Sequence, residues 1–361
     1  RFLSWLDSKI CLRYVFRNIL MKYLIMVDRP KAKLPTLVRL FIFVTLFIAA
    51  PLSRGFCATS FMRFLYPSFS GTWATPWIAK EAGYFAAEGL DIELVRVGGS
   101  TRIVAALLGG SAPFVSAGGS AAIAASAAGS DVVIIAAAFN VSAFHLMARP
   151  EIKQPSDLKG KKAGISAFGS SSDLLVRLAL KKYGLEPGKD VAILPMGGQP
   201  EAFAALQNGS IQIAGLTFPL YLSAAKAGMT EPIKVSDVGF EDVTGTVITT
   251  RSFLSQQRDP TLRFLRAFLR GVYRYKTDKE FTKRVFAKYG KITDDYLLEG
   301  TWQEHAAILQ RVPRPSLKGL QFLIETQFRD KSPLPKPETF VDNSLVDQLE
   351  KSGFIDSLYK Q

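Results

Sequence analysis

Cysteine and histidine are scarce in this chain of 361 residues. The two cysteines, Cys11 and Cys57, both lie within the first 58 residues, so the rest of the chain has no disulfide, thiolate metal site or cysteine nucleophile. The only histidines, His145 and His305, are far apart in the sequence. No cluster of histidine, cysteine and carboxylate residues has the spacing of a metal site. We therefore expect packed, hydrogen-bonded histidines and neither a metal nor a cofactor.

Two common nucleotide and hydrolase motifs are also missing. Ser120 follows Gly118 and Gly119, but no Gly-x-Ser-x-Gly elbow surrounds it. The glycine pairs that begin at Gly98 and Gly197 lack the Gly-x-x-x-x-Gly-Lys-Ser/Thr pattern of nucleoside-triphosphate sites. These absences count against hydrolase chemistry and nucleotide binding.

Positive charge is in excess, but it is not arranged for nucleic acid. The formal net charge is +14, and residues 1–58 hold ten Lys/Arg against two Asp/Glu. The remainder holds 35 Lys/Arg against 29 Asp/Glu, mixed along the chain in a way typical of solvated helix faces. No basic run is interleaved with aromatic residues, so we expect no nucleic-acid partner.

The N-terminal apolar run, residues 40–50, is shorter than the about 20 residues that a membrane-spanning helix needs. Read from Met26, a basic region precedes this run and small residues follow it, which is the layout of a secretory signal peptide. We expect residues 1–58 to be an upstream extension and signal peptide, cleaved after Cys57 or Ser60. An uncleaved anchor is the alternative. The residues before Cys57 do not fit a lipobox, so lipidation is not expected.

What the body of the chain does contain is a regular alternation of strands, small-residue loops and helices. Apolar segments at 61–69, 89–95, 114–117 and 132–138 predict strands, and residues 78–85, 102–109 and 121–128 predict the helices between them. This order implies a largely parallel sheet covered by helices. Ligands bind such sheets at the carboxyl ends of strands, where the loops 70–72 and 118–120 fall.

The stretch 161–184 repeats the same unit as a short strand, a Gly/Ser loop and an amphipathic helix that ends at Gly184. A helix start leaves N–H groups unpaired and carries partial positive charge, so this loop is a candidate anion cradle. The simpler alternative is that Ser171 or Ser172 acts only as an N-cap.

The segments 81–85 (Glu-Ala-Gly-Tyr-Phe), 88–93 (Glu-Gly-Leu-Asp-Ile-Glu), 157–164 and the Gly169-Ser170 loop occur in a familiar order. As a set they resemble the solute-binding proteins of ABC transporters, in the nitrate/sulfonate/bicarbonate (taurine-like) branch that includes thiamine-pyrimidine-precursor relatives. The resemblance covers about residues 61–310. It implies a type II periplasmic-binding-protein fold, an α/β fold with two lobes, a ligand cleft and two crossing segments. Residues 61–145 and 243–361 would form lobe 1, and 146–240 lobe 2.

The resemblance also implies which loops face the cleft. Small residues there would let backbone N–H groups approach a ligand oxygen, hydroxyls would add donors, and aromatic rings would form an apolar wall. The candidate ligand-binding residues are Ser70, Gly71, Thr72, Trp73, Gly118, Gly119, Ser120, Asn140, Phe168, Gly169, Ser170, Ser171, Thr217, Phe218, Gly245 and Thr246.

The family implies a monomeric, periplasmic, non-enzymatic protein that captures a small molecule and delivers it to an ABC permease in the inner membrane. A sulfonate, nitrate or other small organic anion, or a pyrimidine-like molecule, would be the ligand. One alternative is a binding protein that reports to a membrane receptor. Another is an enzyme like the pyrimidine synthases, which the scarcity of cysteine and histidine disfavours.

Overall fold

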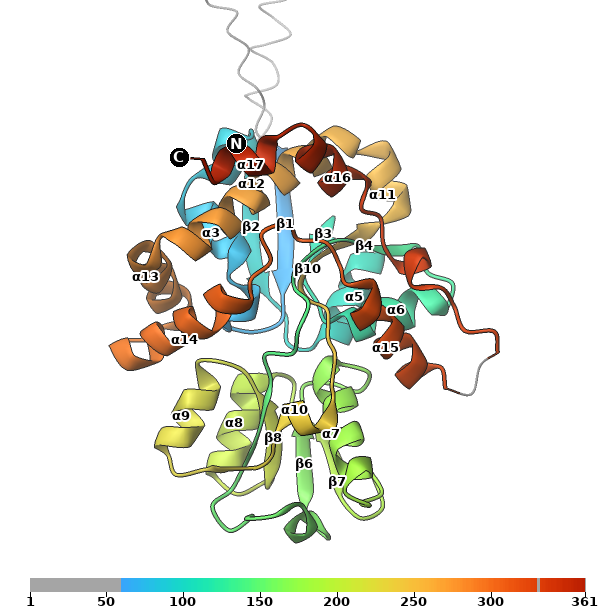
Figure 1. Ribbon diagram of the computed structural model, residues 1–361, viewed down its shortest axis with the longest axis vertical. Helices are drawn as coiled ribbons and strands as arrows, with labels where there is room; N and C mark the ends of the chain where they lie inside the picture. The colour runs from blue at the N-terminus through green and yellow to red at the C-terminus, as the bar shows by residue number, and fades with distance from the viewer. Residues whose placement is uncertain (1–59, 330–331, 361) are drawn as a thin grey trace, which may run out of the picture. The chain divides into compact units, whose positions relative to one another are not determined.

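The computed structural model describes residues 60–329 and 332–360 (Figure 1). The predicted signal peptide at 1–58 lies outside the described residues. Two five-stranded sheets, each covered by helices, form two lobes that the chain connects twice (Figure 1). The first crossing runs from 140 to 144, and the second from 239 to 243.

The sheet of lobe 1 has the order β2-β1-β3-β10-β4. Its strands are β1 (Ser60–Tyr66), β2 (Leu90–Arg96), β3 (Phe114–Val115), β4 (Val132–Phe139) and β10 (Thr244–Thr250). β1 is parallel to β2 and β3, but β10 is antiparallel to both of its neighbours. The sheet is therefore mixed, because β10 enters it from the opposite direction after the chain returns from lobe 2.

The helices of lobe 1 come from both ends of the described chain. The first group is η2 (Gly71–Trp73), α3 (Thr75–Glu81), α4 (Tyr84–Ala87), α5 (Ser100–Leu108) and α6 (Gly119–Ala127). The second group is α11 (Arg251–Gln256), α12 (Arg258–Thr277), α13 (Lys279–Gly290), α14 (Asp295–Ile308), α15 (Leu317–Gln327), η4 (Pro337–Phe340), α16 (Ser344–Lys351) and α17 (Phe354–Leu358).

These two groups share one core. Phe264 of α12 stacks on Phe64 of β1 and Phe114 of β3, with ring centroids 5.6 and 4.5 Å apart. All eight residues of β4 are buried, although the strand stands at the edge of the sheet. Part of this edge is covered by the C-terminal segment, where Val341 forms a bridge with Ile134. After this segment the chain forms the helices α16 and α17.

The sheet of lobe 2 has the order β7-β6-β8-β5-β9. Its strands are β5 (His145–Ala148), β6 (Lys162–Ile165), β7 (Ala192–Pro195), β8 (Ile213–Leu216) and β9 (Thr230–Ile233). Its helices are η3 (Pro155–Leu158), α7 (Ser171–Lys182), α8 (Gln199–Gln207), α9 (Leu220–Lys226) and α10 (Val235–Val238). His145, which the sequence-based division assigned to lobe 1, begins β5 of this second sheet.

Candidate ligand-binding site

A small cavity with several polar side chains in its lining lies where the two lobes meet. Lobe 1 and the crossings supply Pro67, Ser68, Trp73, Gly99, Ser100, Gly118, Phe144 and Thr244, and lobe 2 supplies Ser166, Ser170, Ser171, Ser172, Gly198 and Gln199. The cavity leaves about 30 Å³ to the centres of water molecules, and one water needs about 10–15 Å³ of this measure. With the lobes in this position, only a very small group fits between them.

Four helices begin at this cavity. The N-terminal residues of α5 and α6 line it from lobe 1, and those of α7 and α8 line it from lobe 2. Each is nine residues or longer, so each start carries about half a positive charge and unpaired N–H groups. No Lys, Arg, Asp, Glu or His is among the described residues that line the cavity. The helix starts are therefore the source of partial positive charge in this lining.

Three polar side chains of the lining have no hydrogen-bond partner. They are the Ser68 hydroxyl, the Trp73 indole N–H and the Thr244 hydroxyl, and each residue is at most 6% exposed. A buried polar atom without a partner costs about 1–3 kcal/mol. The indole N–H can only donate, so it requires an acceptor. The cavity is thus equipped to hold a molecule that carries acceptor oxygens.

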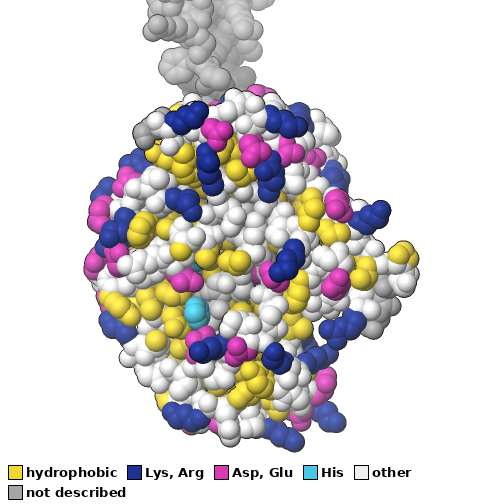
Figure 2. Space-filling view, viewed as in Figure 1, with side chains coloured by type: hydrophobic (Ala, Val, Ile, Leu, Met, Phe, Trp, Pro, Cys, Tyr) yellow, Lys and Arg dark blue, Asp and Glu magenta, His cyan; other side chains and the backbone are white. Residues whose placement is uncertain are grey.

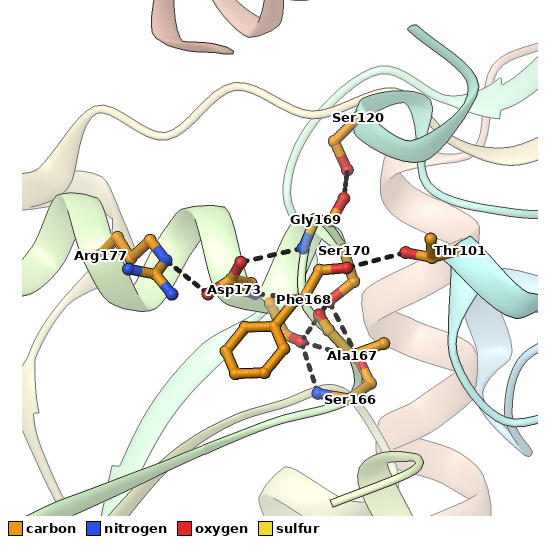
Figure 3. A network of polar contacts seen from close by, with 10 residues as sticks. Thr101, Ser120, Ser166, Ala167, Phe168, Gly169, Ser170, Asp173 and Arg177 are labelled. Carbon is orange, nitrogen blue, oxygen red and sulfur yellow. Dashed lines mark hydrogen bonds and ion pairs between the residues drawn. The ribbon is translucent and has the colours of Figure 1, made fainter. Parts of the chain in front are cut away.

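The loop before α7 is held rigidly by its own side chains (Figure 3). Ser170 is the N-cap of α7 and accepts from the Asp173 N–H, while the Asp173 carboxylate accepts from the Gly169 N–H at 2.9 Å. Arg177 pairs with that same carboxylate at 2.7 Å. Ser172 accepts from the Ser166 N–H at 2.9 Å. This network fixes the backbone of the loop and presents the start of α7 to the cavity.

Lobe 1 contacts that loop directly. The Thr101 hydroxyl donates to the Phe168 carbonyl at 2.9 Å, and the Ser120 hydroxyl lies 3.4 Å from Gly169 O (Figure 3). Ser120 Oγ also lies 3.4 Å from Ser171 Oγ. At another point of the interface, Arg96 of lobe 1 pairs with Glu201 of lobe 2 at 3.1 Å. The contacts of Thr101 and Ser120 thus connect the starts of α5 and α6 in lobe 1 to the loop before α7 in lobe 2.

A second chain of hydroxyls leads from lobe 2 to a buried histidine of lobe 1. The Thr217 hydroxyl donates to Ser70 Oγ at 2.8 Å, Ser70 donates to Thr72 at 3.2 Å, and Thr72 lies 3.1 Å from His305 Nε2. His305 Nδ1 lies 2.9 Å from the Thr301 carbonyl, which can only accept, so Nδ1 carries the proton. Nε2 is then the acceptor for Thr72. Burial lowers the pKa of His305 to about 4, which keeps the ring neutral.

Two glycines of lobe 1 allow the lobes to approach this closely. A Cβ on Gly98 would lie 2.1 Å from the Gly197 carbonyl oxygen, and a Cβ on Gly118 would lie 2.3 Å from Ser171 Oγ. Both contacts join lobe 1 to lobe 2. At Gly98 the contact is with backbone, so any larger residue there would hold the lobes apart, whereas a larger residue at Gly118 would first displace the Ser171 hydroxyl.

One buried acid stands directly behind the cavity wall. Asp242, in the second crossing, is fully buried, and its Oδ1 atom accepts from Ser171 Oγ at 3.2 Å and from the Val243 N–H at 2.8 Å. Its Oδ2 atom has no partner. Burial raises the pKa of Asp242 to about 7, although these two hydrogen bonds act in the opposite direction.

The structure places the predicted site residues in three groups. Four of them line the cavity: Trp73, Gly118, Ser170 and Ser171. Seven form its supports: Ser70, Gly71, Thr72 and Thr217 around the histidine chain, Ser120 and Gly169 at the contact with the α7 loop, and Gly119, whose N–H donates to the Val243 carbonyl of the second crossing. Five lie elsewhere: Asn140, Phe168, Phe218, Gly245 and Thr246.

The residues in the last group have identifiable structural roles. Phe168 is 53% exposed, with the Arg177 guanidinium over its ring. Asn140 donates to the Arg314 carbonyl and accepts from the Ser316 N–H, and the Thr246 hydroxyl bonds to the backbone of Ala117.

The sequence analysis did not select Ser68, Ser100, Ser166, Gln199 and Thr244. Gln199 and Ser100 each follow a Gly-Gly pair, which was a usable signal for a helix start at the cleft. Ser68 and Thr244 gave no comparable signal.

Both histidines are packed and hydrogen-bonded, as predicted. His145 Nδ1 lies 2.9 Å from Glu231 Oε1, and its ring stacks on Tyr221 with centroids 3.7 Å apart. Among the described residues, no group of three or more His, Cys, Asp or Glu side chains is placed to hold a metal ion. Within 60–329 and 332–360, no helix combines the length and the apolar character needed to cross a bilayer.

Two α/β lobes, two crossings and an interlobe cavity lined by helix starts define the fold of the periplasmic binding proteins. Residues 73–278 match the family described as NMT1/THI5 like, and because this is more than half of the chain, the protein belongs to that family.

Solved structures of the same fold are distant in sequence. A protein of Bordetella bronchiseptica superposes with a TM-score of 0.71 and 20% identity, covering 81% of this chain and 98% of the other. The periplasmic nitrate-binding protein NrtA from Synechocystis PCC 6803 superposes with a TM-score of 0.68 and 14% sequence identity, covering 81% of this chain and 89% of the other. The alkanesulfonate-binding protein SsuA from Xanthomonas axonopodis pv. citri, bound to MOPS, superposes with a TM-score of 0.63 and 18% sequence identity. The match covers 78% of this chain and 98% of the other.

Proposed function

We propose that this protein is the extracytoplasmic solute-binding component of an ABC importer. It captures a small solute with one anionic group, such as a sulfonate, nitrate or carboxylate, between its lobes and delivers it to a membrane permease. The observation that carries this proposal is the convergence of four helix starts and three unpartnered buried side chains on one interlobe cavity. Proteins of the same fold that bind nitrate and alkanesulfonate support it.

The chemistry of the lining supports an anion of single charge. Helix starts and hydroxyls supply donors to an oxyanion without a fixed cation, as in many anion sites. A doubly charged solute would meet no Lys or Arg on the wall. The Trp73 and Phe144 side chains provide apolar surface beside the donors, which suits a short organic substituent.

A neutral heterocycle such as a pyrimidine is the second candidate. The same two aromatic side chains and the absence of a lining cation favour it. Catalysis is disfavoured because none of the described lining residues is a His, Cys, Lys, Asp or Glu that could act as general base or nucleophile activator.

Closure of the two lobes would convert binding into a signal for the permease. The interlobe bonds of Thr101, Ser120 and Thr217 form only when the lobes meet, so a solute that contacts both lobes shifts the population toward this closed form. A membrane receptor could read the same change, and the test of transport below separates the two.

The experiment is a thermal-shift and calorimetry panel on the purified protein. The panel contains methanesulfonate, taurine, nitrate, bicarbonate, acetate and a 4-aminopyrimidine. A ligand at about 100 times its dissociation constant stabilises the fold by about 2.7 kcal/mol. We expect a hit among the singly charged anions. A hit restricted to the aminopyrimidine would replace the anion with the second candidate, and stimulation of permease ATPase activity by the loaded protein would establish the importer role.

A further inference from the structure

The buried carboxyl of Asp242 has a place in the molecule that solute capture alone does not explain. It lies in the second crossing, bonded to Ser171 and two positions before Thr244 in the chain, and both of these residues line the cavity. Ser171 bonds to Asp242 Oδ1, and Asp242 Oδ2 is buried without a partner. A carboxyl group therefore stands one hydrogen bond behind the wall that faces the solute.

The described surroundings of Asp242 supply no compensating cation. On α7, Asp173 and Arg177 pair with each other, and Lys181 and Lys182 are in the last turn of the helix, away from Ser171. β10 and α6, which also adjoin the crossing, contain no titratable residue.

The charged groups of α15 are engaged with other surface side chains. Gly319 of this helix lies close to the Asp242 backbone. Its neighbour Lys318 pairs with Glu241 at 2.8 Å, and Glu325 accepts from Gln321 at 2.7 Å. With no countercharge from these groups, burial has the largest effect on Asp242 and raises its pKa to about 7, against the hydrogen bonds from Val243 and Ser171, which lower it.

The start of α7 would lie between two anions, the solute in the cavity and an ionised Asp242. Ser171, the first residue of the helix, is oriented toward Asp242 on one side and lines the cavity on the other. A solute anion in the cavity and an ionised Asp242 would then repel each other across a single hydroxyl in a dry environment. Like charges at such a site do not both remain ionised without a cost.

We propose that the protein binds its anionic solute together with one proton, which Asp242 takes up from solvent as the solute enters. This inference rests on the proposed function, because it requires an anion in the interlobe cavity. The carboxylate becomes a carboxylic acid, and no covalent bond of the solute changes. By linkage, the solute raises the affinity of Asp242 for the proton by the same factor as the proton raises the affinity for the solute.

Protonation also changes what the cavity offers to the solute. An ionised Asp242 can only accept, so it takes the hydrogen of Ser171 and leaves a lone pair toward the cavity. The protonated acid can donate to Ser171 Oγ and free the Ser171 hydrogen for an oxygen of the solute. The same proton thus removes a repulsion and supplies a donor.

The test uses methanesulfonate, which stays ionised throughout the pH range, in calorimetric titrations of the full chain from pH 6 to pH 9. Fully coupled binding predicts a dissociation constant about tenfold higher at pH 9 than at pH 6, which corresponds to a shift of one unit in the pKa of Asp242. Titrations near pH 7.5 in two sulfonate-free buffers of different ionisation enthalpy should show uptake of roughly half a proton per solute. If methanesulfonate does not bind, nitrate replaces it, since nitrate also stays ionised.

The matched variants are Asp242→Asn and Glu241→Gln, which remove a carboxylate at adjacent positions. Asp242→Asn should make the dissociation constant independent of pH. Glu241 pairs with Lys318 at the surface, so Glu241→Gln should show the same pH dependence of the dissociation constant as the wild type. Proton uptake by the wild-type protein decides the question if Asp242→Asn does not fold. A wild-type affinity that is constant from pH 6 to pH 9 overturns the coupling and leaves the proposed function intact. Failure of every anion to bind at pH 6 overturns both.

Discussion

The hydroxyl of Thr217 in lobe 2 donates to Ser70 Oγ in lobe 1 over 2.8 Å, and both residues are buried. This bond connects the lobes to the Thr72–His305 pair, which lies on the far side of Ser70. A contact between the lobes is thereby tied to the interior of lobe 1 through a chain of hydrogen-bonded side chains. The same bond disappears when the lobes separate.

Thr217→Val should therefore weaken closure more than it weakens the fold. The change keeps the shape of the side chain and removes the interlobe bond to Ser70 together with the 2.9 Å contact to Gln199 Oε1 within lobe 2. The interlobe bond contributes about 1 kcal/mol, so we expect about a fivefold loss of solute affinity. Thr249→Val is the control, because its hydroxyl bonds to the Pro113 carbonyl within lobe 1. The control should lower the melting temperature and leave affinity unchanged in calorimetry. Equal affinity losses in both variants would contradict this role for Thr217.

Gly98→Ala should hold the lobes open. The new Cβ would lie 2.1 Å from the Gly197 carbonyl oxygen only when the lobes meet, so the separate lobes would keep their stability. We expect more than a tenfold loss of affinity and no ligand-induced compaction in small-angle X-ray scattering. Gly109→Ala is the matched control, since its nearest neighbour would be 3.4 Å away and it ends α5 without contact to lobe 2. Normal compaction of Gly98→Ala would show that this approach is not needed for closure.

Thr244→Val should separate binding from stability. The Thr244 hydroxyl is buried without a partner, so its removal should leave the free energy of unfolding unchanged or slightly higher. Affinity should fall several-fold, because the solute loses a donor. Thr246→Val, two residues along the same strand, removes a hydroxyl that bonds to the Ala117 backbone and should cost about 1–3 kcal/mol of stability. Denaturant unfolding and calorimetry of the two variants provide the comparison.

Asp242 should make the protein less stable as pH rises. Its pKa is raised from 3.8 to about 7 in the folded state, so the folded protein binds an extra proton between these values. The contribution of Asp242 to the free energy of unfolding is fully present below about pH 4 and is lost as pH rises to about 7, a change of about 4 kcal/mol. Asp242→Asn should remove this component from urea-unfolding free energies measured at pH 5 and pH 8. If Asp242→Asn shows the same pH dependence of the free energy of unfolding as the wild type, another group causes that dependence.

His305 should act in the opposite direction. Burial lowers its pKa from 6.5 to about 4, so its contribution is present above pH 6.5 and is lost as pH falls toward 4, over about 3 kcal/mol. In the wild-type protein this term and that of Asp242 offset each other between about pH 4 and 6.5. His305→Asn should unmask a stability that falls steadily with rising pH in this window. A profile that still matches the wild type would show that His305 titrates normally.

The surface agrees with the charge pattern of the sequence. Figure 2 shows Lys/Arg and Asp/Glu side chains interspersed over the visible face, with apolar side chains in small groups. Ion pairs between neighbouring segments account for part of this mixing, such as Lys226 with Asp294 at 2.6 Å. On this face, charges of the two signs are mixed, as they are along the sequence.

Part of the site was predictable because its signals are local. The Gly/Ser loop before α7 identified Ser170 and Ser171, and the loop 70–73 identified Trp73, since strand–loop–helix order alone places helix starts at one edge of a sheet. Thr244 was not distinguishable from the other β-branched residues of its strand. Asp242 was one acid among 31 Asp and Glu residues. Its burial depends on α15 and α6 covering the crossing, and no local pattern reports that.

The sequence by itself determined the alternation of strands and helices, the two lobes and the family, because period, turn residues and motif order are properties of short segments. Only the tertiary structure decided that β10 enters the first sheet antiparallel and that Gly98 faces Gly197. It also decided that a lone carboxyl stands behind Ser171. These relationships join residues from about 70 to 120 positions apart, and such contacts follow from how distant segments pack within and between the lobes, which local propensity does not encode.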